Sequence, residues 1–288
     1  MNEASRRVFL KTIGVAAAAG SIPFSPEIVQ KAFAKESSGS KTKKAARLFD
    51  LGMASYTFRQ FTLDQVIDMT KRLGMKKITL KDMHLPLKSS DAELVAAIEK
   101  MKQAGLEPES CGVVYMRSED EVRQAFAYAK KAGMKMIVGG PDKAMLPLCE
   151  RVVKETDIIL AIHNHGPTDK NYPSPEDAYK AVANMDKRMG VCIDVSHTQR
   201  IGLDPTDQLT KCFDRVFDIH IKDVSAAQAS GTTVEIGRGV IDIPKLLKQV
   251  IKLNYSHTLH FEFEKDAKDP LPGLAESVGY VRGVLASL

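Results

Sequence analysis

Side chains that can bind metals or move protons follow several short apolar runs of this sequence. Imidazole and carboxylate groups bind divalent metal ions, and imidazole also exchanges protons near neutral pH. The residues concerned are Lys81, Asp82 and His84; His163 and His165; Asp194 and His197; His220, Lys222 and Asp223; and His260, Glu262 and Glu264. If the apolar runs are parallel strands, these side chains lie at their carboxyl ends. The pattern therefore predicts one polar centre built from several strands.

Four of these residues have a spacing that favours a shared metal ion. His163, Asp194, His220 and Glu262 are separated by 31, 26 and 42 residues, roughly one strand–helix unit each. Two imidazoles and two carboxylates suit one divalent ion such as Mn²⁺, Zn²⁺ or Co²⁺ better than Ca²⁺. Side chains alternate along a strand, so His260, Glu262 and Glu264 share a face, and any of them could be the last ligand.

The elements that would position these residues alternate between short apolar runs and amphipathic stretches. The sequence predicts strands at 51–58, 77–80, 112–115, 134–138, 158–162, 191–195, 216–221 and 258–263. It predicts helices at 62–73, 92–104, 119–132, 145–155, 175–189, near 208, at 243–253 and at 274–285. Glycines at 74, 105, 133 and 190 are expected to end helices before the next strand.

Eight strand-then-helix units define the expected fold class. Such alternation gives parallel strands joined by helical crossovers. About 240 residues for eight units favour an α/β, single-domain (β/α)₈ TIM barrel over an open doubly wound sheet. No G-x-G-x-x-G motif follows the first strand, which removes the main support for a dinucleotide-binding fold.

The N-terminus has the features of an export signal. Residues 5–11 read Ser-Arg-Arg-Val-Phe-Leu-Lys, which matches the twin-arginine pattern, and an apolar run and Ala32-Phe33-Ala34 follow. We therefore expect a signal peptide at 1–34 cleaved after Ala34, a flexible linker at 35–47 and the barrel at 48–288. The protein would be periplasmic or otherwise exported, and its precursor would engage the twin-arginine (Tat) export machinery.

Charge and cysteine content exclude some other classes. Residues 48–288 carry a net charge of −1, because the excess positive charge lies in residues 1–47. A nucleic-acid partner is not expected, since binding phosphates requires a basic face. The four cysteines contain no C-x-x-C pair and are expected to be buried free thiols.

Five segments resemble the signatures of the xylose-isomerase-like TIM-barrel superfamily over the whole predicted barrel. They are Leu-Ala-Ile-His163-Asn-His-Gly-Pro, Cys-Ile-Asp194-Val-Ser-His197, Asp-Ile-His220-Ile-Lys222-Asp223, Gly237-Arg-Gly-Val-Ile-Asp242 and Leu-His-Phe-Glu262-Phe-Glu. The superfamily includes sugar isomerases and epimerases, inosose dehydratases and nucleases of the endonuclease IV type. The resemblance implies a metal-dependent enzyme of small carbohydrates.

The resemblance also implies roles for single residues. In the ketose 3-epimerases of this group, Glu, Asp, His and Glu hold the metal. Asp194, His220 and Glu262 match the last three, but His163 stands where the first glutamate would be. His197 resembles the histidine that contacts substrate. Those epimerases move the proton with two metal-bound glutamates, so this chain lacks their symmetric pair.

The expected chemistry is removal of a proton from the carbon next to a carbonyl, with a metal stabilising the resulting charge. The candidate catalytic residues are Glu262, His197, Lys222 and His165, with Glu264 as a further possible base. Lys81, His84, Arg200, Arg238 and Glu264 are candidates for binding substrate.

Several alternatives stay open on sequence alone. The same metal site could support β-elimination or hydration of a 3-keto-glycoside. A non-catalytic sugar-binding barrel would explain His163 in place of glutamate. An endonuclease IV-type nuclease fits least, because it needs more metal ligands and a basic face. Related barrels often pair, so a homodimer is possible.

Overall fold

Residues 49–288 are described by a computed structural model, and they form a closed barrel of eight parallel strands. The ring runs β1-β10-β7-β6-β5-β4-β3-β2 and closes between β1 and β2. The barrel strands are β1 (Asp50–Ala54), β2 (Lys77–Leu80), β3 (Glu107–Met116), β4 (Met136–Pro141), β5 (Ile159–His163), β6 (Met189–Asp194), β7 (Val216–Ile221) and β10 (Thr258–Phe261). The predicted TIM barrel is confirmed. The predicted signal peptide and linker lie outside the described residues.

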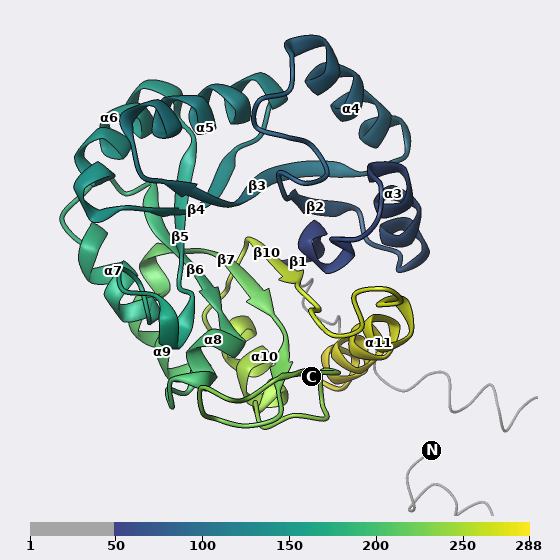
Figure 1. Cartoon of the computed structure of the whole chain (residues 1–288). Helices are drawn as coiled ribbons and strands as arrows, with labels where there is room; N and C mark the ends of the chain where they lie inside the picture. The colour runs from purple at the N-terminus through teal and green to yellow at the C-terminus, as the bar shows by residue number, and fades with distance from the viewer. Residues whose placement is uncertain (1–48) are drawn as a thin grey trace, which may run out of the picture. The chain divides into compact units, whose positions relative to one another are not determined.

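Helices connect the strands and surround the ring (Figure 1). They are α3 (Leu63–Arg72), α4 (Asp91–Gln103), α5 (Glu119–Ala132), α6 (Leu146–Thr156), α7 (Pro175–Val182), α8 (Val195–Arg200), α9 (Pro205–Cys212), α10 (Ile243–Lys252) and α11 (Leu271–Ser287). Short 3₁₀ helices lie at Ser55–Phe58, Lys143–Met145, Gly166–Thr168 and Phe213–Arg215. No helix within residues 49–288 is long and apolar enough to cross a membrane.

Local sequence sets most helix boundaries. At the start of α3, the side chain of Thr62 accepts a hydrogen bond from the Gln65 backbone amide, and the Gln65 side chain accepts one from the Thr62 amide. Gly74, Gly105 and Gly133 have φ values of 65°, 81° and 70°, which suit the turns that follow α3, α4 and α5.

Strand alternation divides the residues of β7 between two environments. Ile219 and Ile221 pack in the apolar layer between the strands and the helices. Asp218 and His220 are the alternate residues, and both are buried. Because side chains on a strand point alternately to opposite faces, these polar residues face the barrel interior. The interior therefore contains charged groups where most barrels carry aliphatic ones.

The structure corrects the prediction for residues 175–189. Helix α7 ends at Val182, and the following turn is bound by the buried guanidinium of Arg215, which donates to the carbonyls of Ala183, Met185, Asp186 and Met189. Gly190 does not end a helix. It lies in β6, where a Cβ atom would come within 2.1 Å of the Arg215 carbonyl oxygen.

Several other elements differ from the sequence predictions; for example, β3 begins at Glu107 rather than at residue 112, and β10 ends at Phe261 rather than at residue 263. Residues 55–58 form a 3₁₀ helix rather than the end of β1. Helix α8 was not predicted, because its six residues are too few for a helical period to show. A small antiparallel pair, β8 (Asp223–Val224) with β9 (Thr233–Val234), follows β7.

Asp223 holds the loop that contains the Gly237-Arg-Gly motif. Its carboxylate accepts hydrogen bonds from the backbone amides of Gly237, Gly239 and Ile241 at 3.0–3.1 Å. A Cβ on Gly239 would lie 2.1 Å from an oxygen of this carboxylate, so only glycine fits there. This motif is therefore structural: it closes the loop around Asp223.

Candidate metal centre

Four successive interior strands bring His163, Asp194, His220 and Glu262 together. One ligand atom from each lies within 4.8 Å of the other three, and all four residues are buried. His163 and Asp194 are the last residues of β5 and β6, His220 lies near the end of β7, and Glu262 directly follows β10. These are the carboxyl ends of the strands, where TIM barrels place their chemistry.

The imidazole of His163 lacks the hydrogen-bond partners that its burial demands. Both of its ring nitrogens are buried without a hydrogen bond. A buried polar atom left unsatisfied costs about 1–3 kcal/mol, so the two nitrogens indicate a missing partner. Two imidazoles and two carboxylates fit Zn²⁺, Mn²⁺ or Co²⁺. The residues present therefore fit one divalent metal.

Asp194 is oriented by the helix that follows it. Its Oδ1 accepts the backbone amide of His197 at 2.8 Å and the hydroxyl of Ser196 at 3.0 Å, which makes Asp194 the N-cap of α8. The side chain of Asn164 accepts the Asp194 amide at 2.9 Å. Because Oδ1 accepts the hydrogen bonds of the N-cap, Oδ2 is the oxygen of Asp194 that faces the other residues of the group.

His220 is held between two carboxylates. Its Nδ1 lies 3.2 Å from Glu262 Oε2, and its Nε2 lies 3.5 Å from Asp218 Oδ2. Carboxylates beside a metal-binding histidine fix its ring and its tautomer. Cys192 also lies near this ring and forms a second three-residue group with His163 and His220. Burial raises the pKa of the Cys192 thiol to about 12, which keeps it protonated without a metal.

Lys222 neutralises the carboxylates at the centre. Its ammonium lies 2.8 Å from Asp194 Oδ2, in ion-pair contact, and donates to Glu262 Oε2 at 2.6 Å and to Glu264 Oε1. Burial lowers the pKa of Lys222, but the three carboxylates outweigh burial and hold that pKa well above its usual value. Lys222 is therefore a cation at neutral pH, able to donate a proton or stabilise negative charge, and it is a poor base.

The two carboxylates of the group are ionised because positive charges lie beside them. Burial raises the pKa values of Asp194 and Glu262, but Lys222 and the nearby histidines outweigh it and hold both pKa values well below their usual range. Burial also lowers the pKa of His163. Burial lowers the pKa of His220 too, but Cys192, Glu262 and Asp218 outweigh burial and hold that pKa well above its usual value. Anionic carboxylates and a neutral imidazole are the forms that bind a metal, so His220 would give up a proton on binding one.

A cavity of about 420 Å³ opens over this centre. The predicted residues His165, His197, Lys81, Arg200 and Glu264 line it together with His163 and Glu262. The His165 and His197 rings lie 4.4 Å apart. Burial lowers the pKa of His197 to about 3, so this imidazole is neutral.

Two residues predicted to bind substrate lie outside the lining of this cavity. His84 has both ring nitrogens engaged, with Ser55 Oγ and the Phe58 carbonyl at 3.0 Å each, so it ties the β2 loop to the turn after β1. Arg238 pairs with Glu276 on the exposed outer side of α11. His260, the alternative metal ligand, lies below the centre and contacts Asp218 and Glu109 instead.

Sequence reasoning missed Tyr56 and Tyr115, which also line the cavity. Tyr115 is 43% exposed at the end of β3. An aromatic residue at the carboxyl end of a barrel strand was the available signal. It carries no information without the strand's position, because isolated exposed aromatics are common.

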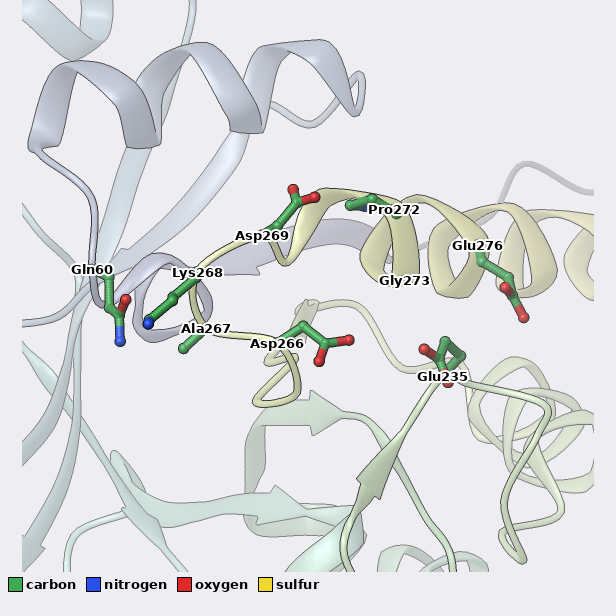
Figure 2. Close-up of a pocket in the computed structure, with 9 residues that line it drawn as sticks. All are labelled: Gln60, Glu235, Asp266, Ala267, Lys268, Asp269, Pro272, Gly273 and Glu276. Atoms are coloured by element: carbon green, nitrogen blue, oxygen red, sulfur yellow. The ribbon is translucent and has the colours of Figure 1, made fainter.

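A larger cavity of about 750 Å³ lies between the loop after β10 and α11 (Figure 2). Its charged lining residues include Glu235 and Glu276, which pair with Lys265 and Arg238. It contains none of the predicted site residues. The predicted site residues therefore gather around the smaller cavity and not around this one.

The chain belongs to the family described as xylose isomerase-like TIM barrel, whose model matches residues 57–284. No curated protein sequence matches it closely enough to count as a relative.

Solved structures share this fold. An uncharacterized protein from Parabacteroides distasonis ATCC 8503 is 25% identical, with a TM-score of 0.65 over 82% of this chain and 98% of its own. The 3-keto-D-glucoside 4-epimerase of E. coli is 16% identical, with a TM-score of 0.64 over 82% and 99%. The IOLI protein with a bound zinc atom is 16% identical, with a TM-score of 0.68 over 83% and 99%.

Proposed function

We propose that this protein is a metal-dependent enzyme that removes a proton from the carbon next to a carbonyl group of a small carbohydrate. The observation that carries the proposal is the buried group of His163, Asp194, His220 and Glu262, whose ligand atoms lie within 4.8 Å of one another beneath an open cavity. The similar folds of a keto-sugar epimerase and of a zinc-binding protein support this reading.

The residues around the centre have different roles in the proposed reaction. A bound divalent ion would polarise the carbonyl of the substrate and acidify the neighbouring C–H bond. Glu264 and His165 line the cavity and are placed to accept the proton. Lys222, held as an ammonium by three carboxylates, stabilises the negative charge that develops on oxygen or returns a proton.

Measuring both the metal content and the exchange of the α-proton tests this proposal. We expect about one transition metal per purified chain, and exchange of the α-proton of 3-keto-glucosides or ketoses with D₂O, followed by NMR. Replacing His220 with Ala removes a ligand and should abolish both. His257→Gln is the matched control, since His257 contacts only Phe217 and Tyr255 among the described aromatic rings and belongs to no ligand group.

Glu262→Gln tests the ligand assignment more finely, because it keeps the size of the side chain and removes its charge. We expect weaker metal binding and at least about a hundredfold slower exchange. Metal content and exchange that both stay intact in Glu262→Gln would show that the centre is assigned wrongly.

A second reaction on the same site is β-elimination from a 3-keto-glycoside. His163 replaces one of the two glutamates of the epimerases, which leaves one face of the centre without a carboxylate base. A base removes the proton on C2, the electrons of that C–H bond form the C1=C2 double bond, and the C1–O bond breaks. The leaving oxygen takes a proton and departs as an alcohol. Release of free alcohol, rather than an epimer of the substrate, distinguishes elimination by NMR.

A further inference from the structure

A second cavity adjoins the one over the metal centre. It has a volume of about 280 Å³ and shares two lining residues, Tyr115 and His165, with the first. Sites for small molecules usually measure about 300–1,000 Å³, so the second cavity is the size of one small group beside the reacting one. The two cavities together provide room for a substrate longer than one sugar ring.

The polar groups of the second cavity suit an uncharged, hydroxyl-rich occupant. Its charged lining residues are balanced, Arg117 and Lys170 against Asp142 and Asp169. A phosphate or carboxylate group would gain no net attraction from such a set. Carboxylate oxygens accept hydrogen bonds from hydroxyl groups, and an amide side chain both donates and accepts them, as vicinal hydroxyl groups of a sugar require.

These polar groups are already fixed in place. The Asn171 side chain donates to Asp142 Oδ1 at 3.2 Å, and Asp169 Oδ1 accepts the backbone amide of Asn171 at 2.7 Å. The backbone amide of His165 donates to the Tyr172 carbonyl at 3.1 Å, which ties this loop to the wall of the metal cavity. A site held in this way loses little conformational entropy when a ligand binds.

Tyr115 forms the boundary between the cavities. Its ring packs against Gly140, where a Cβ atom would lie 3.2 Å from two ring carbons. The Arg117 guanidinium and the Lys81 ammonium lie 5.4 Å and 5.9 Å from the ring centroid. The ring is thus supported while 43% of the residue stays exposed, and an aromatic surface of this kind offers an apolar face to a sugar.

We propose that the cavity bounded by Tyr115, Asp142 and Asn171 binds the second ring of a two-ring glycoside whose reacting ring sits over the metal centre. This inference rests on the proposed function and names its substrate class. Another cavity, of about 320 Å³, also reaches Tyr115 but shares no other residue with the metal cavity. The second ring is therefore assigned to the side of His165.

Paired probes that share the reacting ring test the proposal. Isothermal titration calorimetry of the metal-loaded protein compares methyl 3-keto-β-D-glucopyranoside with 3-keto-cellobiose, and the α-linked methyl glycoside with 3-keto-maltose. We expect the disaccharide of at least one pair to bind about tenfold or more tightly than its methyl glycoside, because the second ring adds hydrogen bonds and apolar contact.

Substitutions in the second cavity test where the disaccharide gains its affinity. Asn171→Ala and Asp142→Ala should each remove most of the advantage of the disaccharide while affinity for the methyl glycoside and metal content stay unchanged. Lys88→Ala is the matched control, since Lys88 lines only the other cavity at Tyr115. Loss of the advantage in Lys88→Ala alone would overturn the assignment of the second ring.

Two further outcomes separate this inference from the proposed function. If the methyl glycosides bind and both disaccharides bind no better, the second-ring site is wrong and the proposed function stands. If the metal-loaded protein binds neither member of either pair but exchanges the α-proton of a free ketose, the glycoside substrate class is wrong. If it neither binds the probes nor exchanges such a proton, the proposed function fails as well.

Discussion

His260 shows how a single residue of the barrel interior can control stability. It is fully buried, its Nδ1 lies 2.7 Å from Asp218 Oδ1, and its Nε2 lies 3.1 Å from Glu109 Oε1. Burial lowers the pKa of His260, but the two carboxylates outweigh burial and raise that pKa from 6.5 to about 9. The charged imidazole therefore stabilises the fold by offsetting the two buried carboxylates.

The raised pKa of His260 predicts a pH dependence with a definite sign. Its contribution to the free energy of unfolding is fully present below about pH 6.5 and is lost as the pH rises through about 9, on the order of 3 kcal/mol. His260→Asn keeps a hydrogen-bonding group that does not titrate. Urea unfolding at pH 6.5, 8 and 9.5 should show the wild-type protein losing its advantage over the variant. A constant difference across this range would contradict the assignment.

Lys222 shows at the same scale why residue type alone does not give a role. The sequence marks it as one possible base among five. The surrounding carboxylates of Asp194, Glu262 and Glu264 keep it protonated. Charge state is a property of the neighbours, and these neighbours come from the ends of two other strands, β6 and β10.

At the scale of elements, Arg215 determines how α7 leads into β6. The residue is 1% exposed, and its guanidinium donates to four backbone carbonyls between residues 183 and 189. These carbonyls have left the helical hydrogen-bond pattern and need donors. The arginine thus replaces the hydrogen bonds that a longer helix would have made.

Arg215→Met should destabilise the fold by about 3 kcal/mol or more, because it keeps much of the apolar stem but leaves buried carbonyls unsatisfied. The urea midpoint of unfolding measures the effect. Arg238→Met is the control: its pair with Glu276 is exposed on the surface, so little change is expected. Equal effects of the two substitutions would show that Arg215 is not a structural donor.

At the scale of the whole molecule, we propose that the N-terminal segment has a role of its own: residues 1–34 direct export of the folded protein through the twin-arginine route. The pattern at residues 5–11 supports this proposal. Export in the folded state would allow the metal to be loaded before the protein crosses the membrane.

Replacing both Arg6 and Arg7 with Lys tests export directly. The variant keeps the positive charge of the segment but loses the paired arginines, so we expect the protein to remain in the cytoplasm with its longer, uncleaved N-terminus. Cell fractionation with mass spectrometry of the N-terminus measures both. An exported and cleaved double variant would contradict the twin-arginine reading.

The sequence by itself determined the architecture and the residues that could form the centre. The repeat of apolar run and amphipathic helix specified eight βα units, and period-two alternation predicted which side chains of a strand share a face. It also placed His260, Glu262 and Glu264 on one face without choosing among them. The boundary errors at residues 55–58 and 183–189 arose where contacts from distant residues replace local preference.

The tertiary structure decided which of these residues meet. Alternation gives the face of a strand but not the height along the barrel axis, which depends on how the tilted strands are staggered. That stagger puts Glu262 at the level of His163, Asp194 and His220, and leaves His260 below them beside Asp218. It also brings Tyr115 of β3 to the same cavity as His165. Heights and neighbours are set by packing between strands far apart in the chain, so no local pattern encodes them.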